Sequence, residues 1–158
     1  MRKELKPILY NYFKENNQLK FISIDLGYGF LDNIRKDFPE KFIIIGSSEQ
    51  LAMGIAIGLA ENGYIPIVYS ITPFLLFRAA EWLRNYLNKE NVPVKLLGAG
   101  RNFDYKHDGF THYANDDKDI MRCFSNIKCF WPKNIDELYK IFPKFIYNGK
   151  PSYLNIKR

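Results

Sequence analysis

The chain alternates short apolar runs with longer amphipathic segments, a pattern typical of repeated strand–helix units. Six runs rich in Ile, Val, Leu, Phe or Tyr predict β-strands, and most of them end at Gly, Pro or Asp. Because these runs are apolar throughout, both faces of the sheet must be covered, which favours parallel strands. The predicted strands are Phe21–Asp25, Phe42–Ile45, Ile65–Tyr69, Val94–Leu97, Ile127–Phe130 and Tyr153–Ile156.

Segments of helical length separate these strands, and one more precedes the first strand. Right-handed crossovers through such helices give a three-layer α/β fold. We therefore expect an open sheet of about six mostly parallel strands with helices on both faces. The predicted helices are Lys3–Asn16, Phe30–Asp37, Ser48–Asn62, Phe74–Lys89, Asp116–Phe124 and Ile135–Asn148.

Composition limits the classes of protein that fit this pattern. With 158 residues, of which 47% are hydrophobic, the chain can bury one ordinary core, so we expect a single domain over residues 1–158. No apolar run approaches the roughly 18 residues of a membrane span, which makes a cytoplasmic protein without membrane contact the expectation. The net charge of +6 comes from scattered lysines without an arginine-rich run, which argues against nucleic acid as a partner.

Several chemically active side chains follow predicted strands. In parallel α/β sheets, ligands collect beyond the carboxyl ends of the strands. Glu49 lies among small residues after the second strand, and Phe74 and Phe77 open the helix after the third. A carboxylate beside aromatic rings suits a flat, basic heterocycle. From spacing alone, Glu49 could instead be a first-turn glutamate stabilised by the helix dipole, and the phenylalanines could be plain core residues.

The segment Gly46–Ala80 resembles the pyrimidine-binding domain of transketolases and related thiamine diphosphate enzymes. Further along the chain, NVPVKLLGAG and DGFTH resemble a strand and a loop of that family, in the same order and at similar spacing. The resemblance implies that Glu49 bonds to the aminopyrimidine of thiamine diphosphate and activates the cofactor. It also implies that Phe74 and Phe77 seat that ring and that Asp25 lies near the cofactor. Asp25 could equally be a capping or turn residue.

The same resemblance implies the residues that bind substrate. His112 matches a loop histidine that contacts substrate oxygens, and Asp108 matches an aspartate that binds a substrate hydroxyl. Arg158 falls where the family holds a substrate phosphate, and Arg101 stands beside Gly100, where the family has a second phosphate contact, a histidine. Because that histidine is absent, a sugar and a sugar phosphate both remain candidate substrates. The loop also departs from the family at Phe110, where proline is usual, so its backbone path and the direction of His112 can differ from the family's.

The family's Gly-Asp-Gly motif, which holds Mg²⁺ on the cofactor diphosphate, does not occur in this sequence. The resemblance therefore implies one subunit of a split transketolase, similar to a C-terminal section, in which the diphosphate-binding and C-terminal domains are absent. A diphosphate-binding partner would hold the metal, with two copies of each chain, and the enzyme would transfer a two-carbon ketol unit between sugars. Three alternatives stay open: a non-catalytic or regulatory remnant, a subunit of a decarboxylase or acyloin synthase, and an unrelated α/β nucleotide-binding domain.

Overall fold

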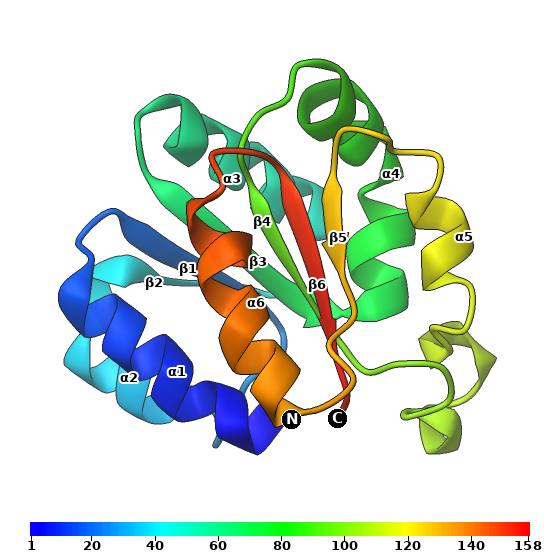
Figure 1. The fold of residues 1–158 in the computed structure, drawn as a ribbon, viewed down its shortest axis with the longest axis horizontal. Coiled ribbons are helices and arrows are strands. Elements are labelled where there is room, and N and C mark those ends of the chain that lie inside the picture. Colours follow the sequence, from blue (N-terminus) through cyan, green and yellow to red (C-terminus); the bar gives the residue numbers. More distant parts are fainter.

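All six strands lie in one sheet, in the order β2-β1-β3-β4-β6-β5, and every neighbouring pair is parallel. The computed structural model describes every residue from Met1 to Arg158 (Figure 1). The predicted sheet is confirmed, and each strand begins and ends within about two residues of the expected position, the accuracy that strand boundaries allow. The strands are β1 (Leu19–Ile24), β2 (Phe42–Ile45), β3 (Ile65–Ile71), β4 (Lys95–Ala99), β5 (Lys128–Phe130) and β6 (Ser152–Ile156).

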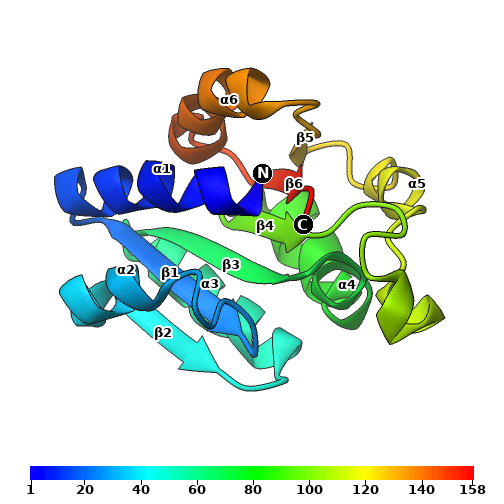
Figure 2. The ribbon, with the colours of Figure 1, turned by 90° about the horizontal axis from the view of Figure 1, so that it is seen from below.

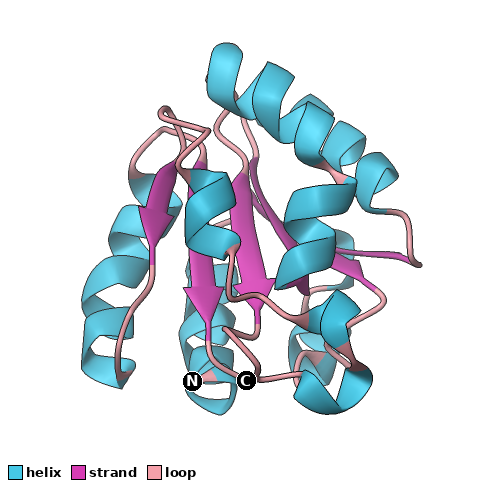
Figure 3. Cartoon of the chain, turned by 90° about the vertical axis from the view of Figure 1, so that its right-hand side faces the viewer, coloured by secondary structure: helices cyan, strands magenta, loops and turns pink.

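Helices cover both faces of the sheet, which confirms the predicted three layers (Figures 1 and 3). One apolar cluster joins α1, α2 and α6 to one face and includes Phe13, Phe21 and Phe142. The other joins α3 and the helical segments after β3 to the opposite face, around Met53 and Leu76. The α-helices are α1 (Arg2–Glu15), α2 (Asp32–Asp37), α3 (Glu49–Glu61), α4 (Ala80–Trp82), α5 (Asp117–Met121) and α6 (Ile135–Tyr147).

The helix predicted over Phe74–Lys89 is not a continuous α-helix. It starts with a π-helical turn, η2 (Phe74–Arg78), bends at Ala79, and continues through α4 into a second π-helical turn, η3 (Leu83–Lys89). In an α-helix the third and the fourth following residues both lie near a given side chain, whereas the wider π turn, with hydrogen bonds between residues i and i+5, keeps the fourth on that face and rotates the third away. Phe74 consequently shares its face with Arg78, and Phe77 is turned outward.

The carboxyl ends of the strands meet at one edge of the sheet, which also carries both chain termini (Figure 3). Figure 2 looks at the molecule from that side. The strand order places β2 on one side of β1, and β3 with the later strands on the other. Such a reversal of strand order leaves a crevice between the diverging loops, where α/β proteins bind their ligands. None of the helices combines the length and the apolar character needed to cross a bilayer.

Candidate functional site at the carboxyl edge of the sheet

A cavity of about 190 Å³ opens where the strand order reverses. It lies beyond the ends of β1, β2 and β3, and the long loop after β4 contributes its far wall. Carboxylate, hydroxyl, aromatic and cationic side chains face it together, so it can contact both a polar edge and a flat ring of a ligand. Its lining residues are Ile24, Asp25, Ser47, Glu49, Ser70, Ile71, Phe74, Arg78 and His112.

Glu49 is the buried acid of this cavity. It is the first residue of α3, and only 5% of its surface is exposed. Its Oε1 accepts a hydrogen bond of 2.7 Å from Nη1 of Arg78, whose own side chain is 47% exposed. The helix N-terminus stabilises a negative charge at this position, as the sequence pattern alone indicated. Burial against the cavity distinguishes Glu49 from an ordinary first-turn glutamate, which faces solvent.

Phe74 forms the aromatic wall of the cavity. The guanidinium carbon of Arg78 lies 3.9 Å from the centre of the Phe74 ring, a close cation–π contact. The ring of His112 meets Phe74 edge to face, with centroids 4.8 Å apart. Phe77, which we expected beside Phe74, is 48% exposed and does not line the cavity. The structure therefore brings Phe74 and His112 to Glu49, and places Arg78 where the sequence led us to expect Phe77.

Asp25 stands at the opposite side of the cavity in a backbone conformation that few residues other than glycine adopt. Its φ is +40°, and its N–H donates to the carbonyl of Ile45 over 3.3 Å. Its Oδ2 accepts a hydrogen bond of 3.4 Å from the hydroxyl of Ser47. Backbone strain of this kind concentrates at ligand-binding positions, because the surrounding structure must maintain it.

The loop after β4 carries the two other predicted loop residues in separate 3₁₀ turns, η4 (Lys106–Asp108) and η5 (Phe110–His112). A bridge between Asn102 and Ala114 closes the base of this loop. His112 lines the cavity, and its Nδ1 lies 3.0 Å from the Thr111 hydroxyl. Asp108 lies outside the cavity, with its Oδ2 3.1 Å from Nε2 of His107. Phe110 is 80% exposed.

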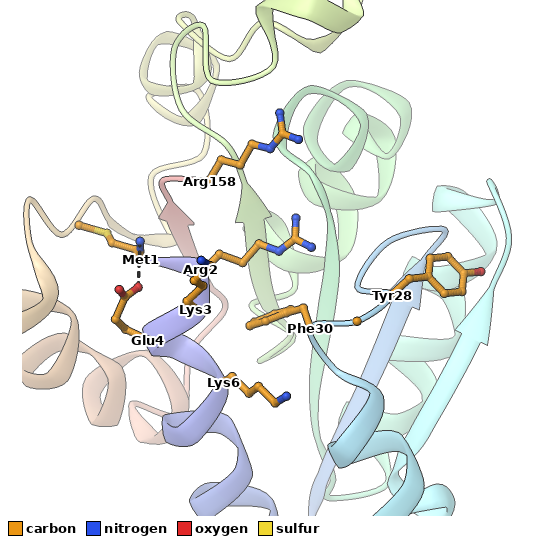
Figure 4. Close-up of a pocket in the computed structure, with 9 residues that line it drawn as sticks. Met1, Arg2, Lys3, Glu4, Lys6, Tyr28, Phe30 and Arg158 are labelled. Carbon is orange, nitrogen blue, oxygen red and sulfur yellow. Dashed lines mark ion pairs between the residues drawn. The ribbon is translucent and has the colours of Figure 1, made fainter.

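A larger, basic hollow of about 560 Å³ lies at the same edge, between the N-terminus of α1, the loop after β1 and the end of β6 (Figure 4). Figure 4 shows the guanidinium groups of Arg2 and Arg158 extending in the same direction, with Arg2 above the Phe30 ring. The only acid in its lining, Glu4, is paired with the terminal amine at 3.1 Å. The net positive charge suits an anionic ligand group. The lining residues are Met1, Arg2, Lys3, Glu4, Lys6, Tyr28, Gly29, Phe30 and Arg158.

Three further contacts fix the position of Arg158. Its backbone N–H donates to Oδ2 of Asp104 over 3.0 Å, and its Nη1 lies 2.9 Å from Nε2 of His107. Its guanidinium also lies 4.8 Å from the centre of the Tyr105 ring. The terminal arginine is thus held against the long loop. We did not predict from the sequence that the basic residues of α1 line this hollow, because no motif marks them. Only the fold brings them to Arg158.

Arg101, by contrast, lines neither hollow. Its guanidinium points inward and donates to the backbone carbonyls of Pro132, at 2.7 Å, and of Asn155. Burial lowers the pKa of Arg101, although Asp117 nearby opposes that shift. Gly100 beside it has a φ of +86°, and a Cβ there would overlap a ring carbon of Tyr105. No side chain fits at position 100 while Tyr105 keeps its place, so a histidine there is sterically excluded.

The buried carboxylate of Asp117 anchors the end of the long loop after β4. Asp117 begins α5, directly after the loop, and is 5% exposed. Its Oδ2 accepts hydrogen bonds from Nε1 of Trp131 at 2.7 Å, the Tyr153 hydroxyl at 2.9 Å and Nδ2 of Asn155 at 2.6 Å. Burial raises the pKa of Tyr153 well above its usual value, and Asp117 adds to that shift. Asp117 therefore connects the end of the loop to the sheet.

Metal-ligating side chains do not gather anywhere in the chain: no group of three or more His, Cys, Asp or Glu has a geometry that could hold an ion. Both cysteines are free thiols. Burial raises the pKa of Cys129 to about 12, so this thiol stays protonated at neutral pH. The residues of the site thus offer acid–base, stacking and anion-binding chemistry of their own.

Known proteins of similar sequence include subunits and sections of transketolases. The chain is 33% identical over 121 residues to a subunit of the apulose-4-phosphate transketolase of Actinobacillus succinogenes, a match that covers 77% of this chain and 39% of that protein. It is 28% identical over 159 residues to the putative transketolase C-terminal section of Methanocaldococcus jannaschii, covering 100% of this chain and 50% of that protein. The chain thus spans about half, or less, of the length of these relatives.

Solved structures of transketolases have a similar fold. A split gene transketolase described as an inactive beta4 tetramer superposes with a TM-score of 0.86 at 27% identity, covering 99% of this chain and 50% of that one. Transketolase from Campylobacter jejuni shares the fold with a TM-score of 0.88 at 20% identity, covering 99% of this chain and 25% of that one. The family model of the transketolase pyrimidine-binding domain matches residues 1–158. This chain therefore belongs to the transketolase family, as its pyrimidine-binding domain.

Proposed function

We propose that the chain is the pyrimidine-binding subunit of a split, thiamine diphosphate-dependent transketolase, which transfers a two-carbon ketol unit between sugars. The observation that carries the proposal is the buried carboxylate of Glu49 beside the Phe74 ring, in a cavity at the reversal of strand order. The names of the relatives support it, because they are transketolase subunits or sections. The intact Glu49 carboxylate speaks against a remnant that has lost its chemistry.

The residues of the cavity fit the aminopyrimidine half of the cofactor. When bound, thiamine diphosphate supplies the carbon nucleophile of the reaction. Glu49 would share a proton with a ring nitrogen, which a carboxylate shielded from water does more readily than a solvated one. Phe74 would cover one face of the ring, and the Asp25–Ser47 pair would contact its polar edge. His112 would bind a substrate oxygen and hold a proton at that oxygen.

The diphosphate and its Mg²⁺ need oxygen ligands that this chain does not assemble. We assign both to a partner subunit, with two copies of each chain completing two shared sites. Activity would then depend on the assembled heteromer.

Co-expression with a diphosphate-binding subunit tests this assignment. We expect the purified complex to retain thiamine diphosphate and to transfer ketol units, whereas each chain alone retains little cofactor and is inactive. Cofactor content is measured by fluorescence after oxidation to thiochrome. A lone chain that keeps stoichiometric cofactor and turns over a ketose would contradict the split site.

The basic hollow around Arg158 leads to a prediction about substrate. Substituting Arg158→Ala in the complex should raise KM for a phosphorylated ketose about 30-fold, since a charge-assisted contact to phosphate is lost. KM for the unphosphorylated ketose and kcat for both should change little, because only uniform binding is removed. Lys157→Ala, an exposed neighbour of the same charge, is the matched control. Equal increases in KM for both ketoses would show that this hollow does not bind the phosphate.

A further inference from the structure

Arg78 contacts both Glu49 and Phe74, the two side chains proposed above to hold the cofactor ring. We propose that its guanidinium takes the place of the aminopyrimidine in the free chain, so that the cofactor must displace Arg78 to bind. The proposal rests on the function proposed above and adds a positioning residue that the sequence pattern did not reveal.

The contacts of Arg78 are those that a flat, basic heterocycle would make. An N–H of its guanidinium donates to Oε1 of Glu49 over 2.7 Å, and its central carbon lies 3.9 Å from the centre of the Phe74 ring. A guanidinium is planar, cationic and able to stack on aromatic rings while it donates to a carboxylate. The ring of the cofactor and the guanidinium therefore compete for the same oxygen and the same aromatic face.

The volumes support this competition. The cavity that Arg78 lines measures about 190 Å³, which is below the roughly 300 Å³ at which pockets for small ligands begin. A neighbouring surface hollow of about 450 Å³ shares three of its lining residues with that cavity: Ser47, Glu49 and Arg78. Arg78 thus belongs to the wall between the two hollows. Its withdrawal would join them into one pocket that is open to the surface.

The two partners of this ion pair differ in their freedom to move. Glu49 is 5% exposed and fixed at the start of α3, whereas the long Arg78 side chain is 47% exposed. Arg78 can therefore swing into solvent, and Glu49 cannot follow. Until the cofactor arrives, the arginine compensates a carboxylate that would otherwise be buried without a partner, which is costly. Arg78 thereby keeps the Glu49 carboxylate directed into the cavity.

Titration of the cofactor-free reconstituted complex with thiamine diphosphate and Mg²⁺, followed by calorimetry or ligand-observed NMR, tests the proposal. Substituting Arg78→Ala should lower the dissociation constant about five- to tenfold, because the cofactor no longer displaces an ion pair. Arg84→Ala removes an equal charge from an exposed position of the same helical segment and should leave the constant unchanged. Arg78→Lys keeps the positive charge but cannot stack a planar group on Phe74, so its dissociation constant should lie between those of Arg78→Ala and the wild type. This variant still tests the proposal if Arg78→Ala folds poorly.

Thermal unfolding provides a second measurement. The Arg78→Ala complex should melt at a lower temperature than the wild-type complex when free of cofactor, and should gain more stability from the cofactor. Equal or weaker cofactor binding by Arg78→Ala, compared with Arg84→Ala, would overturn the displacement and make the arginine a cofactor contact. Absence of binding to the wild-type complex and to every variant complex would overturn the proposed function itself, and this inference with it.

Discussion

Substituting Glu49→Gln is expected to lower kcat of the reconstituted enzyme about 1,000-fold, within the range that positioned acid–base groups contribute. Glutamine keeps the size of the side chain and can still bond to Arg78, but its amide cannot take up and return a proton. The effect is measured by steady-state ketol transfer at saturating thiamine diphosphate, so that weaker cofactor binding does not change the measured kcat.

Glu61→Gln, at the exposed far end of α3, makes the same chemical change outside the site and should leave kcat unchanged. Thermal unfolding should show that both variants fold. Retention of more than about a tenth of the wild-type kcat by Glu49→Gln would rule out the proton role, since such a small loss is below the contribution of acid–base catalysis.

Substituting Asp117→Ala should lower the free energy of unfolding by about 3–5 kcal/mol, because it leaves the buried donors of Trp131, Tyr153 and Asn155 without an acceptor. Urea unfolding measures this loss. It is calculated from the change in the midpoint urea concentration, provided that the slope of free energy against urea concentration stays the same. Asp117 also ends the loop that carries His112. Ketol transfer should therefore weaken as well, even under conditions in which the variant is fully folded.

Asp116→Ala is the matched control, because the neighbouring aspartate is exposed and makes no side-chain cap bond. Its effect should stay below about 1 kcal/mol. Asp117→Asn, which keeps an acceptor oxygen, should fall between the two. A loss below about 1 kcal/mol for Asp117→Ala would mean that the three donors find other partners, and that the carboxylate does not organise the loop.

Much of the fold was predictable because its signals are local. Apolar runs such as Ile65–Tyr69 predict strands that are buried on both faces, and the helical segments between them leave a covered parallel sheet as the consistent arrangement. The order of the elements also placed Glu49 and Phe74 at one edge of the sheet. Their meeting in one cavity follows from the rule that parallel strands all end at the same side.

Two side chains lie elsewhere than the sequence led us to expect, for different physical reasons. Phe74 and Phe77 are three residues apart, which predicts one face of an α-helix, but the π-helical turn η2 rotates Phe77 outward and leaves Arg78 over Phe74. A one-residue change in hydrogen-bond spacing has no clear signature in the sequence. Arg101 was expected to contact substrate beside Gly100, whereas in the structure backbone carbonyls accept the hydrogen bonds of its guanidinium.

The amino-acid sequence by itself determined the elements, the parallel sheet and the edge at which chemistry is possible, because hydrophobic periodicity and residue order carry that information. Only the tertiary structure decided which side chains touch. The pairing of Arg78 with Glu49 joins residues 29 positions apart, and the basic hollow joins Arg2 to Arg158 at opposite ends of the chain. Such contacts depend on how helices pack on the sheet and on the exact turn that each helix adopts, and no local pattern encodes either.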